Sequence, residues 1–388
     1  MSTKKIYMDY QASTPLDPTV LGAMMPYLTT EFGNPHSSEH AIGWQANNAV
    51  DLSLNKIAEC LHCDTDELFF TSGATEANNL AILGLAARAP KNRRRVLVSA
   101  IEHKCVIASA RAAATKFGAV VQKIPVNSDG FVELSVLEQM LSEDVLLVSV
   151  MAANNEIGTI QDTAKIASLC HKYGALLHTD AAQLLTAENI DIQLMGSDLM
   201  SLSGHKIYGP KGIGALFIKR DIQGQIEPLI YGGGQQSGLR SGTLPVALCV
   251  GLAHAIDLIS AKAISVERIR IRGLRDKLWS MLQTLSPMVA LNGPEVSERH
   301  PGNLSVSFHG YDAHELIGMM QPNLAVSTGS ACSSGIPEPS HVLRAIGLSG
   351  DQAESTIRFG IGRFSSEEDV IAAADLTRLA LHKLACAA

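Results

Sequence analysis

The chain of 388 residues has no long uninterrupted apolar run. Its first nine residues contain no apolar h-region, so we expect no secretory signal. No stretch is apolar for long enough to cross a bilayer, which predicts a protein without a membrane partner. The run 370–384 is interrupted by Asp375, Arg378 and Lys383 at helical spacing, as in an amphipathic helix packed on a core.

Positive charge is also scarce, since 31 Lys and Arg residues face 38 Asp and Glu residues and the net charge is −7. A general nucleic-acid binder has a basic surface, so we expect no nucleic-acid partner. The one compact basic run comprises Lys91, Arg93, Arg94 and Arg95, directly before an apolar segment. This position favours the solvated start of a strand over a nucleic-acid patch.

The seven cysteines show no regular pattern. Cys60 and Cys63 have the spacing of half a zinc site, but no second Cys or His pair stands at a matching distance. Ordinary helix-end residues are therefore favoured over metal or redox use, and we predict no metal site. An odd, scattered set in a chain without a signal fits a reducing compartment, so the predicted location is cytoplasmic.

The chain has no internal repeat, low-complexity tract or Pro-rich linker. Strands are predicted at 68–71, 96–99, 145–150, 176–179 and 199–201, and helices at 77–88, 105–117, 134–141 and 163–173. This alternation predicts an α/β fold with a mainly parallel sheet covered by helices on both faces. A long helical pattern from about 246 to 285 leads to a smaller C-terminal α/β domain. The predicted division is an N-terminal arm at 1–15, a large domain at 16–255 and a small domain at 256–388.

Two polar motifs follow predicted strands, where ligands of such sheets bind. The segment 203–212 places Lys206 in a glycine-rich turn, where it is a candidate to form a Schiff base. An ordinary surface lysine is the alternative. The segment 178–183 places Asp180 at a strand end, where its carboxylate can face the pyridine nitrogen of pyridoxal phosphate (PLP). The alternative for Asp180 is a helix cap.

Two further motifs are rich in small and hydroxylated residues. The segment 71–78 follows a strand and opens a helix, so its backbone N–H groups can bind a phosphate. A plain N-cap at Thr75 is the alternative. The segment 327–335 predicts a mobile loop in which Cys332 is accessible, with an unremarkable loop thiol as the alternative.

In the order of these motifs, the sequence resembles the cysteine desulfurases of iron–sulfur cluster assembly and nitrogen fixation. They belong to the class V aminotransferase family, which has PLP fold type I. The resemblance runs nearly end to end and includes the segments 9–15, 32–35, 102–104, 154–158, 240–245 and 357–359.

The resemblance implies a role for each matching residue. Lys206 would carry the cofactor, and Cys332 would receive the sulfur. His103 would stack on the ring and relay protons, while Asn155 and Arg358 would bind the substrate carboxylate. The residues implied to bind PLP are Ala74, Thr75, His103, Asn155, Asp180, Gln183, Ser203, His205, Lys206 and, from a second subunit, Thr243.

The resemblance also implies the reaction and the partners. L-Cysteine would yield L-alanine and a persulfide on Cys332. The enzyme would be a homodimer that passes sulfur to an acceptor protein such as a cluster scaffold. A selenocysteine lyase or another β-eliminating PLP enzyme would not need Cys332, and a catalytically dead scaffold would be free to lose Lys206 or Asp180.

The sequence departs from the family pattern in three places. The first two concern the sulfur acceptor, and the third is unexplained. The chain ends at Ala388 without a recognisable counterpart of the scaffold-docking extension. The segment 219–225 is less basic than in some relatives. Gln11 replaces a small residue or Asn, and the sequence offers no reason for it.

Overall fold

The computed structural model describes residues 5–260, 263–285, 289–328 and 340–387. A seven-stranded sheet forms the centre of the larger part, with strand order β2-β8-β7-β6-β5-β3-β4. The strands are β2 (Leu68–Thr71), β3 (Arg95–Ser99), β4 (Val120–Ile124), β5 (Val145–Ser149), β6 (Leu176–Asp180), β7 (Leu199–Ser203) and β8 (Gly214–Ile218). Only β8 is antiparallel to its neighbours β2 and β7. The mainly parallel sheet predicted from the sequence is confirmed.

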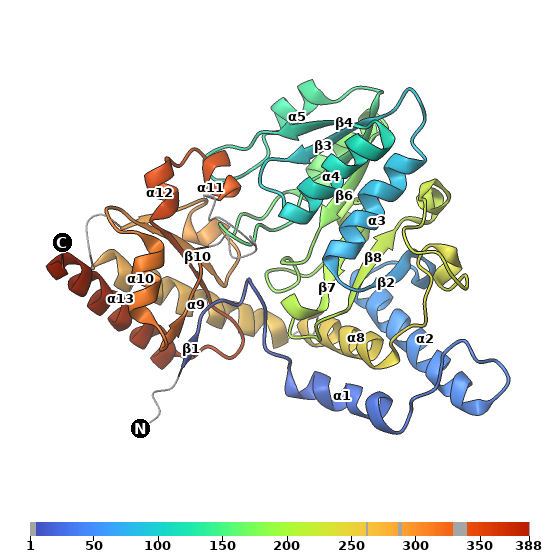
Figure 1. The fold of residues 1–388 in the computed structure, drawn as a ribbon, viewed down its shortest axis with the longest axis horizontal. Helices are drawn as coiled ribbons and strands as arrows, with labels where there is room; N and C mark the ends of the chain where they lie inside the picture. The colour runs from blue at the N-terminus through green and yellow to red at the C-terminus, as the bar shows by residue number, and fades with distance from the viewer. Residues whose placement is uncertain (1–4, 261–262, 286–288, 329–339, 388) are drawn as a thin grey trace.

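Helices cover both faces of this sheet (Figure 1). Adjacent residues in a strand point to opposite faces, so Phe69 packs with α3 (Ala74–Ala87) and α4 (Lys104–Phe117), while Phe70 packs with α2 (Ala41–Leu61) and α8 (Val246–Ser260). The helices α5 (Leu134–Met140) and α6 (Thr163–Lys172) cover the face opposite α3 and α4, beside β5 and β6. Burial on both faces explains the apolar run in a central strand such as β5.

The edge strand β2 has a side-chain partner on its outer side. Gln236 accepts a hydrogen bond from the backbone N of Phe70 at 2.6 Å and donates to the carbonyl oxygen of Phe70 at 3.0 Å. Its amide group therefore makes the pair of hydrogen bonds that a neighbouring strand would make.

A smaller part contains the antiparallel sheet β12-β10-β9 and its own apolar core. Its strands are β9 (Val289–Leu291), β10 (Asn303–Phe308) and β12 (Thr356–Gly360), and the helices packed on them include α9 (Ala263–Gln283), α10 (Ala313–Met320) and α13 (Glu367–Ala387). The predicted amphipathic C-terminal helix is α13. The long helical pattern at 246–285 comprises two helices: α8 packs in the core of the larger part, and most of the buried residues of α9 belong to the core of the smaller part.

The N-terminal arm joins the smaller part. The strand β1 (Ile6–Tyr7) pairs in parallel with β11 (Leu324–Ala325), and the buried side chains of Ile6 and Met8 belong to the smaller core. The chain then runs along the larger part to α1 (Pro18–Thr29), which packs on α8 (Figure 1). The domain limits at 15 and 255 stay a prediction.

No single helix among the described residues has both the length and the apolar composition of a membrane span. The bent pair 246–260 and 264–283 meets those two criteria only when its members are taken together, and α8 is mostly buried in the core.

Gly214 of β8 lies where the strands β2 and β7 and the turn at Gly73 come close together. It pairs with Thr71 of β2 and with Ser203 of β7. A Cβ at position 214 would lie 2.7 Å from the Cα of Gly73 and would also overlap the carbonyl oxygen of Leu202. Both obstacles are backbone atoms, which cannot rotate away.

Gly214→Ala is therefore expected to lower the free energy of unfolding by about 3 kcal/mol, near the upper end for overpacking. The matched control is Gly22→Ala in α1, where no atom lies within 4 Å of the added Cβ. That change should leave stability unchanged or raise it by up to about 1 kcal/mol, because Ala favours a helix interior. Thermal unfolding of the two variants measures the difference, and equal melting temperatures would contradict the packing argument.

Candidate functional site

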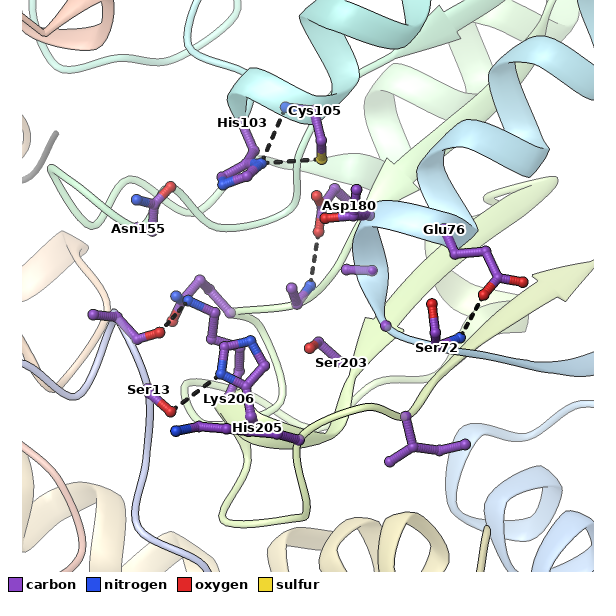
Figure 2. Close-up of a pocket in the computed structure, with 18 of the residues that line it drawn as sticks. Ser13, Ser72, Glu76, His103, Cys105, Asn155, Asp180, Ser203, His205 and Lys206 are labelled. Carbon is purple, nitrogen blue, oxygen red and sulfur yellow. Dashed lines mark hydrogen bonds between the residues drawn. The ribbon is translucent and has the colours of Figure 1, made fainter. Parts of the chain in front are cut away.

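A cavity of about 470 Å³ lies beyond the carboxyl ends of β6 and β7 and beside the start of α3. Figure 2 shows side chains from both sides pointing into it. Nine of the residues predicted from the sequence line this cavity: Ala74, Thr75, His103, Asn155, Asp180, Gln183, Ser203, His205 and Lys206. The fold therefore brings together motifs that are up to 132 residues apart in the chain, from Ala74 to Lys206.

Lys206 lies in the cavity and not in an exposed loop. It ends a short 3₁₀ turn, Gly204–Lys206, that directly follows β7. Its half-buried ammonium donates to the carbonyl oxygens of Gln11 at 2.6 Å and Ala12 at 2.9 Å, both in the N-terminal arm. The arm thus holds the amine at the cavity wall.

Asp180 ends β6, and its side chain is buried. One carboxylate oxygen accepts from Asn78 Nδ2 at 2.7 Å, and the other accepts from the backbone N of Ala182 at 3.0 Å. Sequence reasoning missed Asn78. The available signal was an amide residue four positions after Ala74, among the apolar residues of the buried face of α3.

The first turn of α3 forms one end of the cavity. The N-cap is Gly73, with φ 147°, so the alternative of a cap at Thr75 is wrong. The N–H groups of Ala74 and Thr75 have no intrahelical partner, as at the start of any helix. Glu76 accepts from the backbone N of Ser72 at 2.7 Å and pairs with Arg240 at 2.8 Å, so its charge is matched by that guanidinium.

Ser203 and His205 add neutral groups beside this turn. Ser203 is buried at the end of β7. Burial, reinforced by the charges of Lys206 and Lys211, lowers the pKa of His205 to about 4. Its imidazole is therefore neutral at neutral pH and lies 3.2 Å from the Ser13 hydroxyl.

His103 is the N-cap of α4 and lines the opposite wall (Figure 2). Its Nδ1 lies 3.2 Å from the backbone N of Cys105 and 3.0 Å from Cys105 Sγ. Cys105 also lines the cavity, and sequence reasoning missed it. Its position two residues after His103 on a helix start was the available signal.

Gln183 and Gln11 meet at the base of the arm. The Gln183 Nε2 donates to the carbonyl oxygen of Gln11 at 2.8 Å. The Gln11 side chain donates to the carbonyl oxygen of Gly302 at 3.2 Å. Gln11 therefore connects the arm to the smaller part, which gives a structural reason for a long amide at this position.

Arg358 is buried beside the cavity but does not line it. Its guanidinium donates to Asp9 Oδ1 at 2.6 Å, Ser327 Oγ at 2.9 Å and the carbonyl oxygen of Asn155 at 2.9 Å. Its Nε is buried and has no hydrogen-bond partner in the described part of the chain. The predicted contact with a substrate carboxylate stays a prediction.

Two predicted residues remain, Thr243 and Cys332. Thr243 is exposed and lies outside it. Cys332 lies outside the described residues. The described residues on either side of it are anchored near the site, because Ser327 pairs with Arg358 and the Ser340 hydroxyl donates to Glu156 at 2.5 Å.

Cys60 and Cys63 are the residues at the end of α2, as the sequence suggested, and both pack against the large core. Burial raises the pKa of the Cys63 thiol to about 12. Within the described residues, no group of three or more His, Cys, Asp or Glu side chains could hold a metal ion.

The residues of the cavity fit pyridoxal phosphate. The helix N-terminus, Thr75, Ser203 and neutral His205 provide hydrogen-bond donors suited to a phosphate. The buried carboxylate of Asp180 has one face open to the cavity and can hold a protonated ring nitrogen, and Lys206 supplies the amine. Donors for an anion at one end and a carboxylate at the other match the two ends of this cofactor.

The chain matches the model of the family "Aminotransferase class-V" over residues 6–372. It is 43% identical over 379 residues to a protein from Rickettsia felis named cysteine desulfurase IscS, covering 98% of this chain and 92% of that protein. A protein of the same name from Ehrlichia chaffeensis is 45% identical over 380 residues, with the same two coverages.

Solved structures are similar in fold and sequence. A NifS-like protein superposes with a TM-score of 0.90 at 34% identity, over 97% of this chain and 99% of that one. The structure of SspA in complex with cysteine superposes with a TM-score of 0.82 at 33% identity, over 93% of this chain and 100% of that one. The chain therefore belongs to the aminotransferase class-V family of PLP-dependent enzymes, and within it to the cysteine desulfurases.

Proposed function

We propose that the protein removes sulfur from L-cysteine, releasing L-alanine and leaving a persulfide on Cys332. The observation that carries this proposal is the meeting of Lys206, the buried carboxylate of Asp180 and the first turn of α3 around one cavity. A lysine, a carboxylate and an anion site in this arrangement serve a PLP-dependent reaction at the α carbon of an amino acid.

Bound PLP withdraws electrons from the substrate α carbon, so that the Cα proton becomes acidic. Lys206 would hold the cofactor through its amine, and as a free amine it would take the Cα proton of the substrate. Asp180 keeps the ring nitrogen protonated, and Asn78 keeps the carboxylate in place through the 2.7 Å hydrogen bond.

His103 contacts the ring in this proposal, and Asn155 and Arg358 bind the substrate carboxylate. The carbonyl oxygen of Asn155 accepts from Arg358, so the two residues already form one unit. The unpartnered Nε of Arg358 is a donor for the incoming carboxylate. A planar guanidinium suits this contact because it can donate two parallel hydrogen bonds.

Cys332 accepts the sulfur in this proposal. Its thiolate attacks the substrate sulfur, a sulfur–sulfur bond forms, and the substrate carbon–sulfur bond breaks with its electron pair left on carbon. Protonation of that carbon gives alanine, so no external oxidant or reductant is needed. Ser327 lies five residues before Cys332. A fully extended chain of five residues reaches at most about 18 Å, which is the upper limit on the distance between these two residues.

The proposal includes a sulfur-acceptor protein, such as a cluster scaffold, to remove the persulfide, and a reducing cytoplasmic location that keeps the Cys332 thiol free. It also includes a homodimer, in which exposed Thr243 reaches the phosphate of the partner site. The exposure of Thr243 outside its own cavity supports this, because its hydroxyl is accessible to a second copy of the chain.

Lys206 is expected to carry the cofactor. The purified protein should be yellow, and borohydride should fix the cofactor permanently to Lys206, because its amine is held at the cavity wall. Peptide mapping by mass spectrometry locates the label. Lys211 also lines the cavity and serves as the internal comparison, so a label on Lys211 would refute the assignment.

Asp180→Asn is expected to keep the fold and to lower kcat by about 10²-fold or more, because an amide cannot keep the ring nitrogen protonated. The matched control is Asp162→Asn, at the N-cap of α6 and outside the cavity, where Asn caps a helix equally well. Alanine release measures both variants. Wild-type turnover by the Asp180 variant would remove this carboxylate from the mechanism.

Cys332→Ser is expected to abolish alanine release from cysteine while PLP stays bound, because an un-ionised hydroxyl accepts sulfur poorly. Some turnover of selenocysteine should survive, since selenium is the better leaving group. Mass spectrometry should find the persulfide on residue 332 of the wild type only. If the variant kept most of its activity on cysteine, a β-eliminating lyase would be the better description.

A further inference from the structure

Cys105 is the second residue of α4, and its half-buried side chain lines the cavity. Of the cysteines in the described part of the chain, it is the only one on that wall. Figure 2 shows its sulfur directed toward the ring of His103, and the Sγ–Nδ1 distance is 3.0 Å. A thiol this close to an imidazole nitrogen shares a proton with it, so the direction of the hydrogen bond matters.

The backbone fixes that direction. The N–H of Cys105 points at His103 Nδ1 over 3.2 Å and can only donate, so Nδ1 acts as an acceptor. In a neutral imidazole the proton then lies on Nε2. The thiol approaches the same Nδ1 lone pair, so its S–H is a second donor to that nitrogen.

Asn78 orients the thiol from the other side. Its Nδ2 donates to Asp180 Oδ2 at 2.7 Å and lies 3.2 Å from Cys105 Sγ. Both neighbours accept, so the amide must turn its NH₂ group toward them. With an N–H pointing at the sulfur lone pair, the S–H hydrogen is left for His103. The four side chains thus form one connected network, in which Asn78 donates to both Asp180 and Cys105, and Cys105 is left to donate to His103.

The other end of the Asn78 amide shows what this orientation costs. Its Oδ1 is buried and has no hydrogen-bond partner among the described residues. An unsatisfied buried carbonyl opposes folding by about 1–3 kcal/mol. Stability alone does not favour this arrangement, so the contacts to Asp180 and Cys105 are what the amide serves.

The nearby carboxyl of Glu102 does not disturb the arrangement. Its Oε1 accepts from the backbone N of Met151 at 2.6 Å, and burial raises its pKa well above the usual value. Burial therefore disfavours the charged form of Glu102. The neutral form of this carboxyl adds no negative charge that would hold a second proton on His103.

We propose that Cys105 is a positioning residue for the reaction. Its thiol, oriented by Asn78, donates to His103 Nδ1 and holds the imidazole in the tautomer that carries its proton on Nε2. The inference rests on the proposed function, in which His103 contacts the cofactor ring. It also couples the residue at the ring face to Asp180 at the ring nitrogen.

Cys105→Ala in the holoenzyme should lower kcat for alanine release by about two- to tenfold, the change that losing one neutral hydrogen bond produces, and leave KM unchanged. Cys105→Ser keeps a donor and should recover most of the loss. The matched control is Cys60→Ser, which alters a half-buried thiol on α2 outside the cavity. Equal kcat in the wild type and the alanine variant would overturn the proposal.

A second readout does not depend on turnover. In holoenzyme labelled with ¹⁵N-histidine, the His103 signals are those that vanish in His103→Asn. The wild type should show one protonated ring nitrogen and one accepting nitrogen. In Cys105→Ala only the backbone N–H of residue 105 remains as a donor to the accepting nitrogen, so its signal should shift in the direction of weaker hydrogen bonding, and Cys105→Ser should reverse this.

Two spectral results would overturn the proposal. One is a His103 spectrum that is the same in the wild type and in Cys105→Ala. The other is a wild type with both ring nitrogens protonated, which would mean a thiolate–imidazolium pair. If the wild type releases no alanine from cysteine, the proposed function fails, and the spectra still decide whether the thiol donates to His103.

Discussion

The carboxylate of Asp180 is buried at the end of β6, and an ionised group in that position needs hydrogen bonds from its surroundings. Asn78 supplies one of them from α3, so the register of that helix against the sheet is set by this contact. Asn78 lies one helical turn after Ala74, and the first turn of α3 is therefore held at a fixed distance from the carboxylate. The Asn78–Asp180 hydrogen bond therefore links the anion site at the start of α3 to the carboxylate of Asp180 at a defined spacing.

The N-terminal arm contacts two other functional residues of the site, Lys206 and Arg358. The carbonyl oxygens of Gln11 and Ala12 hold Lys206, and Asp9 holds Arg358. The arm is also paired with the smaller part through β1. A movement of the smaller part against the sheet would therefore reach the lysine and the arginine together.

The sequence predicted most of the fold because its signals are local. Strands buried on both faces are apolar runs, and glycine and hydroxyl residues mark the turns that follow them, so Lys206, Asp180 and the start of α3 were found as separate motifs. Their joint assignment came from resemblance to a family. Asn78 and Cys105 were missed because the weak local signals that they carry gain meaning only from contacts across 102 and 27 residues.

Gln236 has a consequence beyond the site. The outer edge of a sheet exposes N–H and C=O groups that can recruit a strand from another molecule, which leads to aggregation. On β2 that pair of groups at Phe70 is already bonded to the Gln236 amide. A single side chain thus blocks edge-to-edge association at this strand, in a chain whose other sheet edge, β4, carries exposed Gln122 and Lys123.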